Sequence, residues 1–118
     1  MLKFICYPKC TTCRRAWKWL DDNGIEYELR DIKLDKPTLE ELTAWYRLSG
    51  QPIKRFFNTS GLLYKSLELK NKLPQMTEEE LLQLLSTDGM LVKRPLLIGE
   101  AFVLVGFREA EWEEALLK

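Results

Sequence analysis

The chain has 118 residues, of which 46% are hydrophobic, and this is the length and composition of one compact domain with an apolar core. Eighteen basic residues balance eighteen acidic ones, so we expect neither direct nucleic-acid binding nor attraction to a membrane surface. No apolar run reaches the length of a membrane span, and Met1 to Tyr7 is short for a secretory signal, so we expect a cytoplasmic protein.

The first thirty residues follow a strand–helix–strand pattern. Leu2 to Tyr7 is mostly apolar and predicts a short strand, and Ile25 to Asp31 alternates apolar and charged residues as a second strand does. Between them a helix is predicted from about Thr11 to Asn23, with Gly24 as its stop signal. A unit of this length normally contains two parallel strands.

The middle of the chain is predicted to be helical. Two capping boxes, Thr38 with Glu41 and Thr77 with Glu80, each precede an apolar run. The turn-rich stretch 54–61 separates them, and one or two short helices are expected after it.

Strands return near the end of the chain. Leu96 to Gly99 and Ala101 to Val105 are short apolar runs, and Gly99 with Glu100 predicts a tight hairpin turn between them. A last helix is expected from Arg108 to Lys118.

The order of these elements is βαβ, a helical insert at about 38–88, and then ββα. This is the order of the thioredoxin architecture with helices placed before its third strand. The sequence therefore predicts one α/β, thioredoxin-like domain over residues 1–118, built on a four-stranded mixed sheet.

The cysteines carry the predicted chemistry. A Cys-x-x-Cys motif in the turn from a strand to a helix is typical of redox-active dithiols. Cys10 is expected at the N-cap of the first helix, where the helix dipole and the positive charges of Lys9, Arg14 and Arg15 favour a thiolate. Cys13 is near one turn further on, so it can reach back and resolve a mixed disulfide or sulfenic acid on Cys10.

The cysteines allow two other interpretations. Cys10 and Cys13 could be unreactive core residues, since cysteine is often a small buried hydrophobe. The spacing of Cys6, Cys10 and Cys13 also equals that of the iron–sulfur triad of radical enzymes dependent on S-adenosylmethionine. The chain has no histidine and no further cysteine as a fourth zinc ligand, so no metal is predicted, and Cys6 is expected in the core.

Arginines are the candidate anion ligands. In the thioredoxin fold a cis proline opens the third strand and faces the redox cysteine, and Pro95 is at that place. Arg94 would then lie near Cys10 and hold its thiolate or an attached oxyanion. Arg55 and Arg108 are further candidates.

Four motifs together resemble the family that contains the glutaredoxin-coupled arsenate reductases and the Spx regulators. They are Tyr7-Pro8-Lys9-Cys10-Thr11-Thr12-Cys13-Arg14-Arg15-Ala16 with Trp19-Leu20, Phe57-Asn58-Thr59-Ser60-Gly61 with Tyr64, Leu91-Val92-Lys93-Arg94-Pro95, and Val105-Gly106-Phe107. The resemblance covers almost the whole chain and is not specific for one activity.

The resemblance implies roles for the site residues. Cys10 matches the nucleophile that attacks arsenate, and Arg94 matches an oxyanion-binding arginine. Arsenate reductases have serine at Cys13 and histidine at Cys6, and their third arginine aligns at about Phe107. The candidate catalytic residues are Cys10, Cys13 and Arg94, and the candidate substrate-binding residues are Arg55, Arg94, Arg108, Pro95, Thr11 and Thr12.

Two functions follow from the resemblance. The first is a thiol–disulfide oxidoreductase with no bound cofactor, which glutaredoxin, glutathione or thioredoxin would reduce. The second is an Spx-like redox-sensing regulator that binds the C-terminal domain of the RNA polymerase α subunit. The chain lacks the extended basic tail that we expect of the Spx branch, whereas its intact dithiol fits both functions.

Overall fold

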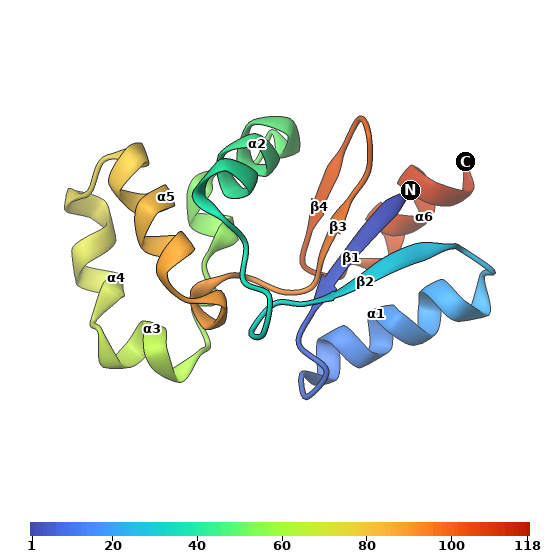
Figure 1. Ribbon diagram of the computed structural model, residues 1–118, viewed down its shortest axis with the longest axis horizontal. Coiled ribbons are helices and arrows are strands. Elements are labelled where there is room, and N and C mark those ends of the chain that lie inside the picture. The colour runs from blue at the N-terminus through green and yellow to red at the C-terminus, as the bar shows by residue number, and fades with distance from the viewer.

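The computed structural model describes residues 1–118, and its centre is a four-stranded sheet (Figure 1). The strands β1 (Leu2–Cys6), β2 (Tyr27–Asp31), β3 (Leu96–Ile98) and β4 (Val103–Val105) are arranged in the order β2-β1-β3-β4. β1 pairs in parallel with β2 and antiparallel with β3, and β3 pairs antiparallel with β4. This confirms the predicted mixed sheet, with the mostly apolar β1 in its interior.

The last two strands are shorter than the sequence predicts. Pairing stops at Ile98 and resumes at Val103, so the loop Gly99–Phe102 replaces the predicted tight turn at Gly99 and Glu100. The Gly99 N–H donates a hydrogen bond of 2.9 Å to the Phe102 carbonyl and closes this loop.

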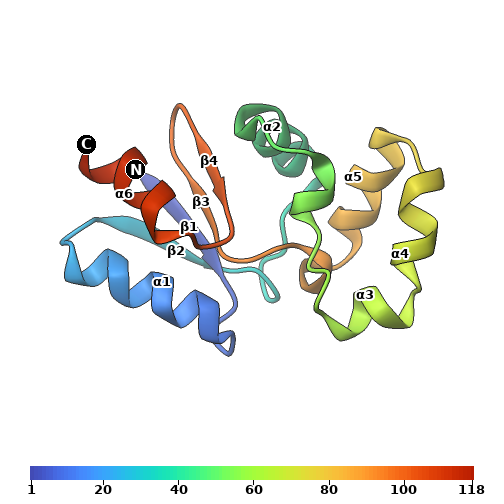
Figure 2. The ribbon, with the colours of Figure 1, turned by 180° about the vertical axis from the view of Figure 1, so that it is seen from behind.

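Each face of the sheet has its own apolar cluster, because successive strand residues point to opposite faces. Phe4 and Cys6 lie in the cluster that helices α1 (Thr11–Asp22) and α6 (Glu109–Leu117) cover. Ile5, between them, lies in the larger cluster on the other face, which the middle helices complete. Figures 1 and 2 show α3, α4 and α5 gathered at one end of the molecule, and α1 and α6 at the other.

The middle of the chain is helical, as predicted. Its elements are α2 (Leu39–Ser49), a 3₁₀ turn (Ile53–Phe56), α3 (Leu62–Ser66), α4 (Leu69–Lys72), a second 3₁₀ turn (Leu73–Gln75), α5 (Glu78–Thr87) and a third 3₁₀ turn (Gly89–Leu91). Both predicted capping boxes are present, at the starts of α2 and α5. None of the helices has the length and apolar character that a membrane span would need.

Gly89 lets the end of this segment lie directly against the loop after β2. A Cβ atom at this position would be 1.8 Å from the Ile32 carbonyl oxygen, so no other residue fits without moving the backbone. This close contact therefore fixes where the end of the middle segment meets the sheet, just before the residues that lead into β3.

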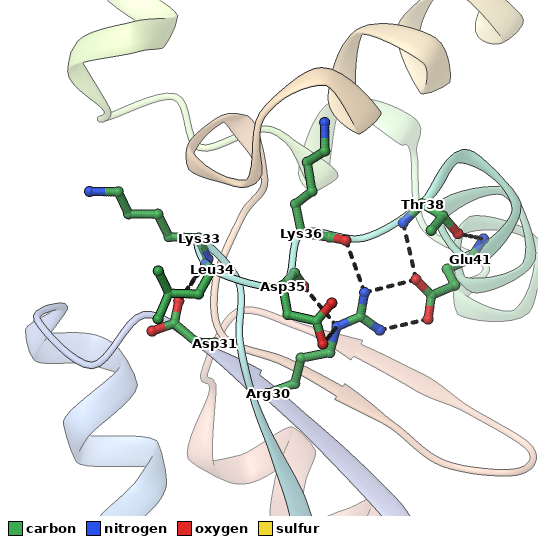
Figure 3. A network of polar contacts seen from close by, with 8 residues as sticks. All are labelled: Arg30, Asp31, Lys33, Leu34, Asp35, Lys36, Thr38 and Glu41. Atoms are coloured by element: carbon green, nitrogen blue, oxygen red, sulfur yellow. Dashed lines mark hydrogen bonds and ion pairs between the residues drawn. The ribbon is translucent and has the colours of Figure 1, made fainter.

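Arg30 joins the sheet to the first helix of the middle segment (Figure 3). Its guanidinium donates two hydrogen bonds to the Glu41 carboxylate, at 2.6 and 2.8 Å, and further bonds to the carbonyls of Asp35 and Lys36. It also lies 5.8 Å from the centre of the Trp45 ring. With only 15% of its side chain exposed, Arg30 fixes the loop between β2 and α2 through a paired, hydrogen-bonded charge.

The Arg30–Glu41 pair predicts an acid-sensitive part of the stability. Hydrogen bonding from Arg30 lowers the pKa of Glu41 to about 2, below the value of about 4.3 expected in the unfolded chain. The charged carboxylate therefore stabilises the fold above pH ~4.5, and this contribution is lost as the pH falls from there toward about 2. We expect Glu41→Gln to lower the free energy of unfolding at pH 7 by about 1–2 kcal/mol.

Urea unfolding followed by circular dichroism between pH 2 and pH 7 checks this prediction. Glu40→Gln is the matched control, because Glu40 is exposed in the same helix turn and should change the free energy by less than about 0.5 kcal/mol. An unchanged slope of stability against pH in Glu41→Gln would contradict the prediction.

Candidate functional site

Cys10 lies where the chain turns from β1 into α1. It is the N-cap residue of α1, with an extended backbone and no side-chain capping bond. Its N–H donates to the Tyr7 carbonyl at 2.9 Å, which closes the turn through Pro8. The first N–H groups of a helix have no partner inside it, so the half-buried Cys10 sulfur faces a concentration of positive partial charge.

Cys13, in the first turn of α1, is fully buried in the apolar cluster against which Cys10 packs. Its sulfur accepts a hydrogen bond of 3.3 Å from the Tyr7 N–H, and it shares this buried cluster with Cys6. The contact with Cys6, together with burial, raises the pKa of the Cys13 thiol far above its ordinary value. In the resting protein Cys13 is therefore a protonated thiol, and Cys10 is the thiol that an external molecule can reach.

A cavity of about 380 Å³ opens beside Cys10. Four separate segments form its wall: the start of α1, the first 3₁₀ turn with the loop after it, the residues before β3, and the residues after β4. The lining residues are Cys10, Thr12, Arg55, Asn58, Ser60, Gly61, Lys93, Arg94, Val105, Gly106, Phe107 and Arg108.

Arg94 lines the cavity, and the peptide bond between Arg94 and Pro95 is cis, as the sequence predicts. The guanidinium lies 5.1 Å from the centre of the Tyr7 ring and donates to the Met90 carbonyl at 3.4 Å. Both partners are uncharged, so they orient Arg94 and leave its positive charge available to a ligand.

Arg55, from the first 3₁₀ turn, is held in a similar way. It donates to the Gln51 side-chain oxygen at 3.0 Å and to the Val105 carbonyl at 3.3 Å. None of Arg55, Lys93 and Arg94 forms an ion pair with a carboxylate. The cavity therefore carries positive charge that only an incoming anion would neutralise.

Two further features complete the wall. Arg108 is mostly exposed and lies 3.7 Å from Glu111, so its charge is partly compensated. Gly106 adopts a positive φ of 76°, and a Cβ atom there would press on the Lys93 side chain at 3.3 Å. Glycine at this position therefore keeps room for the Lys93 side chain beside the cavity.

The structure brings together most of the candidate residues. Cys10, Thr12, Arg55, Arg94 and Arg108 line the cavity, and Cys13 lies in the buried cluster against which Cys10 packs. Thr11 and Pro95 do not line it. Thr11 is exposed at the start of α1, whereas Pro95 is buried.

Three polar lining residues were not among the candidates: Asn58, Ser60 and Lys93. All three lie inside the motifs that carry the family resemblance, so those motifs were the available signal. No local pattern shows that the segment with Asn58 and Ser60 meets the segment with Lys93, because an isolated bridge between Phe57 and Val92 brings them together. No group of three or more Cys, Asp or Glu side chains is arranged to hold a metal ion.

The fold and the site define a class: a thioredoxin-like protein with a dithiol at the start of its first helix and an arginine before a cis proline. More particularly, the chain belongs to the ArsC family, whose model matches residues 6–115.

Relatives within this family have different descriptions. The chain is 51% identical to the uncharacterized protein YusI of Bacillus subtilis over 113 residues, which cover 96% of each protein. It is 33% identical to the regulatory protein MgsR of Bacillus subtilis, covering 93% of this chain and 86% of MgsR. It is 30% identical to the global transcriptional regulator Spx of Enterococcus faecalis, covering 94% of this chain and 83% of that regulator.

Solved structures agree closely with the fold. An ArsC family related protein from Bacteroides fragilis superposes with a TM-score of 0.94 at 59% identity, covering 96% of this chain and 95% of that one. A "possible arsenate reductase" from Streptococcus mutans superposes with a TM-score of 0.90 at 45% identity, covering 98% of both chains.

The charge of the cavity predicts that inorganic oxyanions slow the alkylation of Cys10. Arsenate or sulfate bound between Arg94 and Arg55 would cover the sulfur, so iodoacetamide should react more slowly as the anion concentration rises. Arg94→Ala should weaken this protection about tenfold or more, because hydrogen bonds to charged groups contribute about 1.5–3 kcal/mol.

Alkylation rates measured by mass spectrometry give the apparent affinity for each anion. Arg15→Ala is the matched control, since Arg15 is exposed on α1 and does not line the cavity. Equal protection in wild type and Arg94→Ala would contradict an anion site at Arg94.

Proposed function

We propose that this chain is a thiol–disulfide oxidoreductase in which Cys10 attacks and Cys13 resolves. The single observation that carries the proposal is the place of the two sulfurs. Cys10 borders an open cavity lined by cations, and Cys13 is fully buried in the apolar cluster against which Cys10 packs. Family membership, with relatives that include a "possible arsenate reductase", supports the same chemistry.

The cycle begins at Cys10. Its thiolate attacks one sulfur of a substrate disulfide, the substrate S–S bond breaks, and one substrate thiolate leaves. Cys13 then gives up its proton and attacks the Cys10 sulfur of the mixed disulfide. A Cys10–Cys13 disulfide forms and the second substrate thiol leaves with that proton.

An external reductant completes the cycle. Glutaredoxin, glutathione or thioredoxin would reduce the Cys10–Cys13 disulfide, as in a reducing cytoplasm. The Cys13 thiol stays protonated until Cys10 has reacted, which keeps the two steps in order.

Positive charge at the cavity favours anionic substrates. Arg55 and Arg94 would hold a carboxylate or an oxyanion of the substrate, and Lys93 would add charge without a fixed geometry. Arsenate is the inorganic substrate of this type, and in that case Cys10 would attack the arsenic atom.

Substitution of each cysteine tests the proposal with glutathione disulfide and arsenate in parallel. We expect Cys10→Ser to lower turnover by more than about 100-fold, because the attacking sulfur is lost. Cys13→Ser should instead accumulate a glutathione mixed disulfide on Cys10, visible by mass under non-reducing conditions. Turnover that survives in Cys10→Ser would rule out the proposed nucleophile.

A second candidate function rests on the regulators among the relatives. This chain is 33% identical to MgsR and 30% identical to Spx over more than 90% of its length. We therefore propose, as the alternative, a redox-sensing protein that binds the C-terminal domain of the RNA polymerase α subunit. Titration calorimetry with that domain is the test. We expect an affinity that changes about tenfold or more when Cys10 and Cys13 are oxidised, and absence of binding in both redox states would remove this candidate.

A further inference from the structure

A third thiol, Cys6, lies behind the Cys10–Cys13 pair and is unused by the proposed cycle. Cys6 is the last residue of β1, and Cys13 is in the first turn of α1. Both side chains are fully buried in the same apolar cluster between the sheet and the helix. Strand alternation places Phe4 and Cys6 on the face that α1 covers, and Cys13 begins the buried stripe that Ala16 continues. The two elements therefore present their thiols to each other.

Cys10 packs against the apolar cluster that contains Cys6 and Cys13. Cys13 lies beside Cys6, because the N–H that donates to the Cys13 sulfur belongs to Tyr7, the residue that follows Cys6. The bond from the Tyr7 N–H to the Cys13 sulfur, at 3.3 Å, holds it in this position. Thiol–disulfide exchange needs an attacking, a central and a leaving sulfur, and the three cysteines of this cluster supply them.

We propose that Cys6 is a second partner for Cys13, which moves the disulfide from Cys10–Cys13 to Cys6–Cys13. In this step Cys6 gives up its proton and its sulfur attacks the Cys13 sulfur. The Cys6–Cys13 bond forms, the Cys10–Cys13 bond breaks, and Cys10 leaves with the electron pair and takes up the proton. One disulfide replaces another, so no additional oxidant or reductant is consumed. The step rests on the proposed function, because the Cys10–Cys13 disulfide must form first.

The exchange has a physical consequence that depends on burial. Cys10 borders the cavity, whereas Cys6 and Cys13 are both closed to solvent. After the exchange the oxidised pair lies in the core, where an external thiol cannot reach it without local opening. Cys10 returns to the cavity as a free thiol that can react with a second molecule.

The test uses the full wild-type chain oxidised with glutathione disulfide. Free thiols are alkylated with iodoacetamide in the folded state, and those remaining react with a second alkylating label of different mass in denaturant, before trypsin digestion. Trypsin cuts after Lys3, Lys9 and Arg14, so Cys6 falls in peptide 4–9 while Cys10 and Cys13 share peptide 10–14. A Cys10–Cys13 disulfide stays inside one peptide, whereas a Cys6–Cys13 disulfide links the two.

We expect the linked pair, with iodoacetamide on Cys10, in about a tenth or more of the oxidised chains, since the step exchanges one disulfide for another without a further oxidant. In Cys6→Ala, labelling of Cys10 in the oxidised chains should fall at least tenfold. In Cys10→Ser, treatment with diamide should form the Cys6–Cys13 disulfide directly.

The outcomes separate the two proposals. A wild-type chain that forms Cys10–Cys13 but never the linked pair overturns the exchange and leaves the proposed function in place. A linked pair that carries the label on Cys13 also overturns it, because Cys6 has then bonded to Cys10. Failure of Cys10 and Cys13 to form any disulfide overturns the proposed function itself.

Discussion

The site depends on one short backbone contact, the antiparallel bridge between Phe57 and Val92. Neighbouring N–H groups on either side of it donate hydrogen bonds of 2.8 and 2.7 Å across the two segments. Helices α3, α4 and α5 all lie in the sequence between these two segments, so the bridge joins the two ends of this helical stretch. Because Arg55 precedes one side and Arg94 follows the other, the bridge also sets the relation of the two cavity arginines.

The arginines of this protein differ in the groups that hold them, and this difference separates Arg30 from the two arginines at the cavity. Arg30 is paired with Glu41, and its charge serves to join β2 to α2. Arg55 and Arg94 are held by a side-chain amide, backbone carbonyls and an aromatic ring. A neutral partner fixes the direction of a guanidinium without cancelling its charge, and this is what an anion-binding position requires. With equal numbers of basic and acidic residues in the chain, the excess charge at the cavity comes from this placement.

Local sequence signals predicted the elements that position the site. The βαβ unit and both capping boxes follow from short patterns, because strand alternation and helix capping act over a few residues. The cis bond at Pro95 was instead expected from the place of a cis proline in the thioredoxin fold. Lys93 and Asn58 could not be placed in this way, since their approach depends on a bridge between distant segments. The predicted turn at Gly99 and Glu100 was wrong, because each strand ends where its pairing stops. Residue propensity alone does not determine that point.

Both candidate functions depend on how far each of the three thiols lies below the surface. An oxidoreductase needs an oxidised dithiol that its reductant reaches quickly, whereas a sensor needs an oxidised state that lasts long enough to change a binding surface. Cys10 is open to the cavity and Cys13 is closed, so a disulfide between them has one accessible sulfur and suits rapid reduction. A disulfide between Cys6 and Cys13 has none, because both side chains are fully buried. If the proposed exchange takes place, the lifetime of the oxidised state, which separates an enzyme from a switch, is set by which neighbour Cys13 bonds.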